Sequence, residues 1–126
     1  MATLNPTLTL TSADTTSDAL SVSVTDTLSI AEDVLLSKYQ VGNVAGTSGV
    51  QINNTARKVS HFYVKNSSAV TVYLGSTNAA AAKWITLLPG EFAFFPWNNS
   101  VNLFAVGATG TGNAVEVMEF ETSTAS

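Results

Sequence analysis

The stretch that decides the fold is Leu87-Leu-Pro-Gly-Glu-Phe-Ala-Phe-Phe-Pro-Trp97, in which a Pro-Gly turn precedes four aromatic residues within six positions. Successive side chains of a strand point to opposite faces, so we expect Phe92 and Phe94 on one face and Phe95 and Trp97 on the other. A strand with large apolar groups on both faces has to be covered on both. A chain of 126 residues has little material for two covers, so we expect a partner subunit to supply part of the second.

Short strand patterns separated by turn residues run through the chain. Apolar residues alternate with hydroxyl residues from Leu20 to Ile30, which predicts a half-buried strand. In the second half we expect three strand pairs, namely 58–65 with 70–74, 84–88 with 92–96, and 101–106 with 114–121. Pro89-Gly90 predicts a type II turn, and Asn98-Asn99 predicts a tight turn that uses the left-handed conformation of asparagine.

The number and spacing of these strands indicate the fold class. Residues 30–41 fit either a helix, because Ser29 and Glu32 have capping-box spacing, or a strand over Leu35–Val41, which we favour. About eight short strands with turn signals every eight to twelve residues indicate an all-β fold, either a single-domain antiparallel β-sandwich (jelly-roll-like) or a barrel. We expect residues 1–126 to form this domain, with 1–11 as an N-terminal arm and 122–126 as a frayed tail.

Composition and charge exclude several classes of partner. Charged residues make up 11% of the chain, the net charge is −4, and the five basic residues form no run. Nucleic-acid binders and proteins that bind anionic membranes need clustered Lys and Arg, so we expect neither partner. The absence of cysteine excludes disulfides and thiolate-bound metals, and no cofactor is expected. The N-terminus lacks the basic and apolar segments of a secretion signal, so we expect folding in the cytoplasm.

No group of residues predicts catalysis. His61 is the only histidine, and a single histidine builds neither a metal site nor a triad by itself. The segment Gly46-Thr-Ser-Gly49 lacks the spacing of a nucleophile elbow. Glu119 and Glu121 share one face of a predicted strand, and we interpret them as a solubilising edge rather than as a glycosidase pair. The N-terminal acids lack the pattern of a calcium loop. We therefore expect a non-enzymatic protein with no catalytic residue and no metal.

Three aromatic residues leave two interpretations open. Trp84, Trp97 and Tyr73 could stack on sugar rings, as in a carbohydrate-binding module. Alternatively, the two tryptophans pack in the core or at a subunit interface. We favour the second interpretation, because sugar platforms usually have polar hydrogen-bonding groups beside them on an exposed face.

Several motifs together resemble small virion proteins of tailed bacteriophages, especially those of cyanobacterial and marine phages. The resemblance spans most of the chain. In the second half it is carried by four segments, which are Tyr63-Val-Lys-Asn66, Val70-Thr-Val-Tyr-Leu-Gly75, Leu88-Pro-Gly-Glu-Phe-Ala-Phe-Phe-Pro-Trp97 and the strand Ala114–Glu121. The Ser/Thr-rich region from Leu8 to Ile30 is similar as well, whereas Glu32 to Thr55 matches least well. These motifs are turn and strand motifs, not chemical ones.

The resemblance implies a capsid decoration or cement protein on the exterior of the virion. Such proteins are often homotrimers that bridge subunits of the major capsid protein, and they are made in the host cytoplasm for late assembly. We expect the shell to be contacted by residues of the arm, namely Thr3, Leu4, Asn5 and Leu8. We expect the domain or the trimer to be held together by Trp84, Phe92, Phe94, Phe95 and Trp97. The alternatives are a tail- or fibre-associated module that binds a host surface glycan and a sugar-binding domain unrelated to phages.

Overall fold

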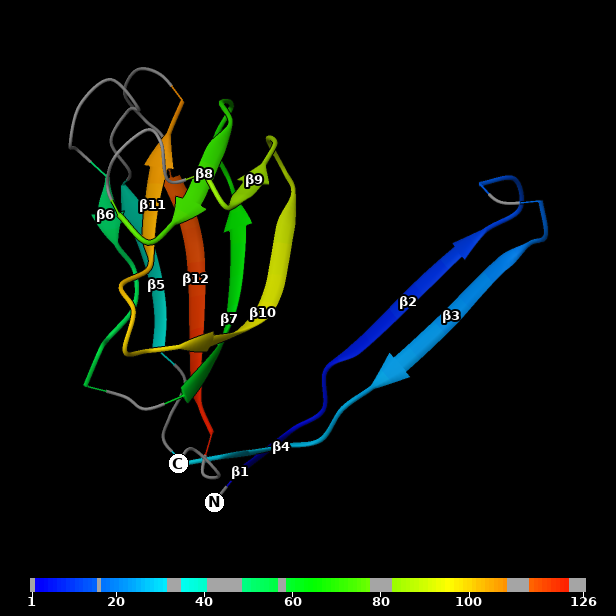
Figure 1. Cartoon of the computed structure of the whole chain (residues 1–126), viewed down its shortest axis with the longest axis horizontal. Coiled ribbons are helices and arrows are strands. Elements are labelled where there is room, and N and C mark those ends of the chain that lie inside the picture. Colours follow the sequence, from blue (N-terminus) through cyan, green and yellow to red (C-terminus); the bar gives the residue numbers. More distant parts are fainter. Residues whose placement is uncertain are drawn as a thin grey trace.

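The computed structural model describes residues 2–15, 17–31, 35–40, 49–56, 59–77, 83–108 and 114–122. Two four-stranded antiparallel sheets pack face to face, and a separate two-stranded arm projects from them (Figure 1). The first sheet, in the order β10-β7-β12-β5, consists of β5 (Leu35–Gln40), β7 (Val59–Asn66), β10 (Phe92–Asn98) and β12 (Ala114–Glu121). The second sheet, in the order β6-β11-β8-β9, consists of β6 (Val50–Gln51), β8 (Val72–Gly75), β9 (Ile85–Leu87) and β11 (Phe104–Gly107). No helix long and apolar enough to cross a membrane occurs among these residues.

The chain changes sheet at nearly every connection. Within the described part of the sandwich, β8 and β9 are the one pair of strands that are neighbours both in sequence and in a sheet. Two sheets with these strand orders make the connectivity of a jelly roll, which is built from two Greek keys. The predicted all-β antiparallel sandwich is therefore confirmed, as is the strand over residues 35–40. No pairing among the described strands closes a barrel.

The three predicted strand pairs are wrong. In each case the two strands lie in different sheets, since β7, β10 and β12 belong to the first sheet and β8, β9 and β11 to the second. Asn66 shows how the first connection leaves its sheet. Its buried side-chain amide donates to the carbonyl oxygens of Val70 (2.7 Å) and Leu87 (2.9 Å), and its Oδ1 accepts from the Ser68 amide (3.0 Å). These bonds hold the chain on a path across the sandwich instead of back along β7.

The predicted type II turn at Pro89-Gly90 is confirmed, and its backbone explains the position of β10. Gly90 has a φ of +85°, and the Glu91 amide donates to the Leu88 carbonyl at 2.9 Å. The turn also exchanges two backbone hydrogen bonds with Asn66 at the end of β7, each of 2.9 Å. The chain therefore leaves the turn along the edge of β7. The next turn closes with the Val101 amide on the Asn98 carbonyl (3.0 Å), but no asparagine in the described chain has a positive φ.

The core lies between the two sheets and is made by alternate residues of each strand. Every second side chain of β7 is fully buried, whereas the intervening ones are half-buried. The buried apolar side chains come from both sheets and from the segments beside them, and they are Ile52, Phe62, Val64, Val72, Leu74, Leu87, Leu103, Ala105, Val115 and Val117. The largest of these, Phe62, stacks on Phe95 with ring centroids 6.0 Å apart. Burial of this set supplies the hydrophobic free energy that holds the sandwich closed.

A buried polar network connects the sheets at one end of the sandwich. The Asn99 Nδ2 donates to Ser60 Oγ (2.8 Å) and to Glu119 Oε2 (3.2 Å), and Ser60 Oγ donates to the same carboxylate oxygen (2.9 Å). Asn99 Oδ1 in turn accepts from Asn53 Nδ2 at 3.0 Å. The expected solubilising edge of Glu119 and Glu121 is therefore wrong for Glu119. Because β12 pairs on both sides with β7 and β5, it is a central strand, and Glu119 points into the sandwich.

The first thirty residues form the arm, which leaves the sandwich at its lower end (Figure 1). Near the sandwich, β1 (Ala2–Leu4) pairs with β4 (Leu28–Ile30), and further out β2 (Thr7–Ser12) pairs with β3 (Leu20–Thr25). The Asp26 amide donates to the Pro6 carbonyl (3.0 Å) between the two ladders. A bridge from Ile30 to Thr122 and a bond from the Ala31 amide to the Glu121 carbonyl (2.8 Å) join the arm to β12.

The arm is longer than predicted, and the predicted tail begins one residue too early. The expected arm of residues 1–11 continues through β3 and β4, because β2 finds its partner in β3 and not in a sandwich sheet. Thr122 is buried and bridged to Ile30, so it is not frayed, whereas residues 123–126 lie outside the described residues. The alternation of residues 20–30 does mark strands. The expected burial is wrong for Val22 and Val24, which are exposed, but Ile30 at the end of the segment is buried.

We predict that Asn99→Ala lowers the free energy of unfolding by about 1–3 kcal/mol, because it removes three hydrogen bonds to buried groups of Ser60, Glu119 and Asn53. Urea unfolding followed by tryptophan fluorescence measures the change. The matched control is Asn102→Ala at an exposed asparagine nearby, which we expect to change stability by about 0.5 kcal/mol or less. Equal stability of the two variants would contradict a structural role of the network.

Candidate functional site

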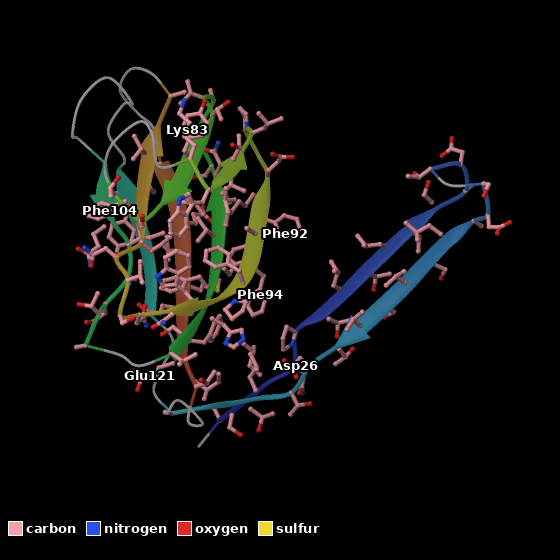
Figure 2. All side chains as sticks on the ribbon, viewed as in Figure 1. Asp26, Lys83, Phe92, Phe94, Phe104 and Glu121 are labelled. Carbon is pink, nitrogen blue, oxygen red and sulfur yellow. The ribbon has the colours of Figure 1, made fainter. Side chains whose placement is uncertain are left out.

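Strand β10 presents aromatic side chains to both faces of its sheet, as the sequence predicts. Phe95 and Trp97 point inward and pack against the core. Phe92 and Phe94 point outward and are 64% and 38% exposed. Figure 2 shows both of these rings on the side of the sandwich that faces the arm. The pleat of the strand produces this division, because neighbouring residues alternate between the two faces.

The outward residues of β10 belong to a larger apolar surface on the first sheet. Strand pairing places Phe94 opposite Tyr63 and Tyr63 opposite Met118, and it places His61 opposite Phe120. Side chains opposite each other on antiparallel strands share a face and contact one another. Ring contacts link the strands further, with His61 and Phe94 stacked at 5.8 Å and Tyr63 and Phe92 at 6.2 Å. We call this surface the outer aromatic face, and it consists of His61, Tyr63, Phe92, Phe94, Met118 and Phe120.

The arm also has an apolar face. Leu8 lies opposite Val24 and Leu10 lies opposite Val22, so these four side chains lie on one side of the β2–β3 hairpin. They are between 36% and 57% exposed. The other side of the hairpin carries hydroxyl groups, including a hydrogen bond of 2.8 Å between the side chains of Thr7 and Thr25. We call the four-residue side the apolar face of the arm, and nothing in the described part of the chain covers it.

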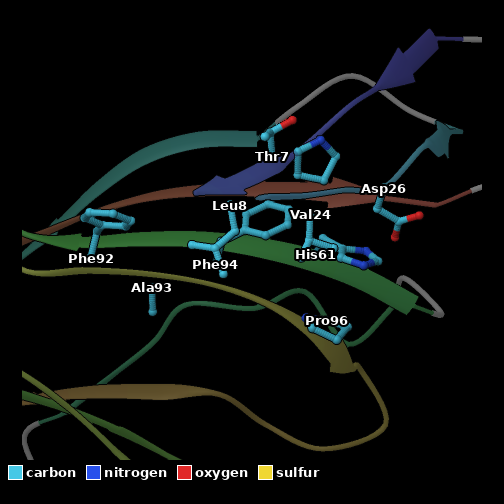
Figure 3. A pocket seen from close by; sticks show the side chains of 10 residues that line it. Thr7, Leu8, Val24, Asp26, His61, Phe92, Ala93, Phe94 and Pro96 are labelled. Carbon is cyan, nitrogen blue, oxygen red and sulfur yellow. The ribbon is translucent and has the colours of Figure 1, made fainter. Parts of the chain in front are cut away.

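A groove separates the base of the arm from the outer aromatic face (Figure 3). Its volume is about 720 Å³. The arm contributes Leu8, Val24 and Asp26 to its walls, and the sheet contributes His61, Phe92 and Phe94. Two surfaces that each lack a cover therefore meet at one open groove.

His61 is the one titratable side chain of the sheet that lines this groove. Burial lowers the pKa of the His61 imidazole below its usual value of 6.5, and the nearby carboxylate of Asp26 partly offsets this by raising it. The Nδ1 atom is buried and has no hydrogen-bond partner among the described residues. The groups around it are mainly aromatic or apolar, so what the groove offers is mainly apolar surface for binding. No group of three or more residues that could hold a metal gathers in the described chain.

A second, smaller feature involves the two tryptophans. Trp84 and Trp97 lie with their rings 5.9 Å apart and tilted by 44°, beside a pocket of about 160 Å³ that Asn98 and Val101 complete. The Trp97 indole N–H donates to the Val101 carbonyl at 2.9 Å, and the ring packs edge-on against Phe95. Trp84 is 60% exposed, so a core position is wrong for Trp84.

The three aromatics that could form a sugar platform do not all gather at this pocket. Tyr73 is not among its lining residues, and the Lys83 ammonium group lies 4.5 Å above the Tyr73 ring. Asn98 is the polar side chain at the pocket, and its Oδ1 already accepts bonds from the amide and the hydroxyl of Ser100. The pocket thus has an exposed ring for stacking and few free groups to orient a sugar.

The remaining predicted contact residues lie at the root of the arm. Thr3 and Leu4 are part of β1, and Asn5 is an exposed residue between β1 and β2. Leu8 lies apart from them, on the apolar face of the arm and at the groove. Sequence reasoning missed Tyr63, Met118 and Phe120 as members of a surface. Their alternation with buried residues was visible, but the order of the strands that brings them together was not.

Comparison with known proteins adds no relative, since no protein-family model, no curated protein and no solved structure matches this chain.

We predict that Trp97→Ala and Trp84→Ala differ in their effect on stability. Trp97→Ala removes a ring that packs on the core and loses its hydrogen bond to Val101, so we expect a loss of roughly 3 kcal/mol in the free energy of unfolding. Trp84→Ala removes a mostly exposed ring, and we expect a loss of less than about 1 kcal/mol. Thermal unfolding by circular dichroism compares the two variants. A larger loss in Trp84→Ala than in Trp97→Ala would show that Trp84, and not Trp97, packs on the core.

We predict that the protein becomes less stable as the pH falls through the range in which His61 titrates. The folded state holds the imidazole with a lowered pKa, so the unfolded chain binds the proton more readily near pH 6.5. The stability contributed by the neutral His61 is therefore complete above about pH 7.5 and declines toward about pH 5.5, where carboxyl groups still contribute little. Urea unfolding at several pH values measures this.

His61→Gln is the matched variant for the pH experiment, and it should remove the decline over this interval. Asp26→Asn should make the decline steeper, because it removes the carboxylate that favours the protonated imidazole. An unchanged slope in His61→Gln would mean that another group is responsible.

Proposed function

We propose that this chain is a non-enzymatic structural protein of a tailed-phage virion, a decoration protein that binds the exterior of the head and stabilises the shell. The observation that carries the proposal is the arm. The chain uses its first thirty residues to build a projecting hairpin, and β2 and β3 contribute no residue to the core of the sandwich. Its exposed apolar face would be a liability in a protein that worked alone, since apolar patches of this kind mark interaction sites.

Three further features support an assembly role. The motifs of the second half resemble those of small phage virion proteins. The outer aromatic face gives the sandwich a second surface for contacts between proteins, and it is rich in the residue types that interfaces favour. The net charge of −4 disfavours a position against packaged DNA, whose phosphates repel an acidic protein.

The mechanism in this proposal is mechanical. Packaged DNA pushes the shell outward, and a protein seated across the junctions between subunits of the major capsid protein adds contacts that must break before the junctions open. A contact of standard size buries about 1,600 Å². Because the contact is repeated around a homotrimer and over the whole head, avidity makes detachment slow. The proposed contacts with the shell are Thr3, Leu4 and Asn5 at the root of the arm. Leu8, the fourth contact expected from the sequence, lies at the groove between the arm and the sheet.

The exposed Trp84 favours a second candidate, a tail- or fibre-associated module that binds a host glycan. Its ring is 60% exposed beside the pocket with Trp97, and an exposed tryptophan is a common stacking surface for a sugar. The shortage of free polar groups at the pocket makes this the weaker candidate.

We predict that the purified chain binds in many copies per particle to heads of its phage that lack it, and that decorated heads withstand a higher temperature before they release DNA. Sedimentation with gel densitometry gives the copy number, and a dye-release melt gives the temperature. Asn5→Arg places a bulky charge at the proposed contact and should weaken binding about tenfold or more. Thr86→Arg, an exposed residue of β9, is the matched control and should bind normally.

The purified chain and its variants also distinguish the decoration protein from the glycan-binding module. Low copy number together with a glycan-array signal that Trp84→Ala abolishes would refute decoration and support the glycan-binding module.

A further inference from the structure

The outer aromatic face and the apolar face of the arm are two open surfaces on one chain. Their exposed large apolar side chains gather in two patches, and such patches mark interaction sites; they are Leu8, Leu10, Val22 and Val24 on the arm and Phe92 and Phe94 on the sheet. The sheet has already used its inner face to build the core, and no strand that the structure describes in the second sheet lies over the outer one. The arm is held beside the groove at its base, and its outer half, with Leu10 and Val22, extends away from its own sandwich (Figure 1).

We propose that the outer aromatic face binds the arm of a second copy of this chain. The apolar face of one arm packs on His61, Tyr63, Phe92, Phe94, Met118 and Phe120 of the next copy, which fills the groove between that copy's own arm and its sheet. In this contact the arm binds as a two-stranded hairpin with an apolar side, and the sheet face on which it packs is also mainly apolar.

The stability of a hairpin supports this assignment. An isolated two-stranded hairpin is marginally stable in water, and it becomes stable when a third strand or a packing surface covers its apolar side. The β2–β3 ladder runs over six residue pairs and would be about 20 Å long at the usual rise per residue. A four-stranded sheet with strands about 4.8 Å apart offers a face of similar extent. The lengths of the two surfaces therefore agree.

The distribution of charge supports a second copy as the occupant. The first thirty residues contain Asp14, Asp18 and Asp26 and no basic residue, whereas all five Lys and Arg residues lie in the rest of the chain. Lys65 lies beside Phe92 in strand register at one end of the outer aromatic face, and Glu116 is its neighbour in the same row. The face thus carries one lysine beside one glutamate, so an acidic arm meets less like-charge repulsion there than it would against a second acidic arm.

An arrangement in which each copy uses both surfaces increases the area that each copy buries. A stable interface takes about 800 Å² from each partner. Each copy would contribute an arm to one neighbour and an outer aromatic face to another, so it buries both surfaces at once. Phe92 and Phe94 and the four apolar side chains of the arm all keep exposed surface that the contact would cover. Such an arm-to-face contact joins different surfaces of identical chains, and it closes into a ring when the rotation between copies allows.

The molecular mass in solution tests the proposal first. At about 0.1 mM, above the micromolar dissociation constants of weak interfaces of this size, light scattering should give a multiple of 13.1 kDa for the wild-type chain. Leu10→Asp on the arm and Phe94→Asp on the sheet should each reduce the mass to 13.1 kDa while circular dichroism still shows a folded sandwich. Thr9→Asp, on the hydroxyl side of the same hairpin, is the matched control and should leave the mass unchanged. A wild-type chain that is monomeric, or an oligomer that either variant leaves intact, overturns the proposal.

Cysteine cross-linking then tests the geometry, which is simple because the chain has no cysteine of its own. A Leu10→Cys chain is mixed with a Phe94→Cys chain that carries a mass tag, the mixture is unfolded and refolded together, and it is oxidised. A disulfide between the two different chains on a denaturing gel is the expected result, and Thr9→Cys in place of Leu10→Cys should give little of it. Equal cross-linking with Thr9→Cys, or none with Leu10→Cys, contradicts the contact.

These results do not depend on the proposed role in the virion. A chain that is monomeric in solution but binds phage heads through Leu10 would show that the shell occupies the arm, which refutes the contact between copies and leaves decoration standing. An oligomer held by arm-to-face contacts that does not bind heads would refute decoration alone.

Discussion

The sheet β10-β7-β12-β5 carries large apolar side chains on both of its faces, and most of the molecule follows from this constraint. Its inner side chains, among them Phe62, Val117 and Trp97, pack on the second sheet and close the sandwich. Its outer side chains form a surface of aromatic rings around Phe94. The hydrophobic effect does not distinguish between the two faces, so the free energy that drives the sandwich together also favours any partner that covers the outer one.

The turn at Pro89-Gly90 is the local feature on which this sheet depends. Gly90 takes the positive φ that a type II turn requires, and the turn then forms two backbone hydrogen bonds with Asn66. Those bonds place β10 beside β7 and not beside β9. A simple hairpin with β9 would have placed Phe92 and Phe94 on the second sheet, away from Tyr63 and His61. The crossing connection therefore assembles the outer aromatic face as well as the jelly roll.

The sequence predicted local features well and sheet membership poorly, for a physical reason. Alternation of apolar residues depends on the pleat of a single strand, and a type II turn depends on two residues, so both are visible in a few letters. Whether a chain that reverses direction returns to the same sheet depends on contacts with distant residues, such as the bonds from Asn66 to Val70 and Leu87. The expected hairpins were wrong for this reason. The buried position of Glu119 was missed in the same way, because its partners Ser60 and Asn99 are 59 and 20 residues away.

The two sides of the arm differ in their affinity for water, and this difference bears on the proposed contact between copies. One side of its hairpin is apolar, and the other carries threonine and serine. Water solvates the hydroxyl side well, whereas the apolar side gains free energy when another surface covers it. The β2–β3 ladder is already formed in the free chain, and docking therefore gives up less conformational freedom than the folding of an unstructured tail would. After docking, the apolar side is buried and the hydroxyl side faces outward. In the proposed assembly, the same alternation that defines the strands would limit contacts to one face of the arm and favour an ordered oligomer over indiscriminate aggregation.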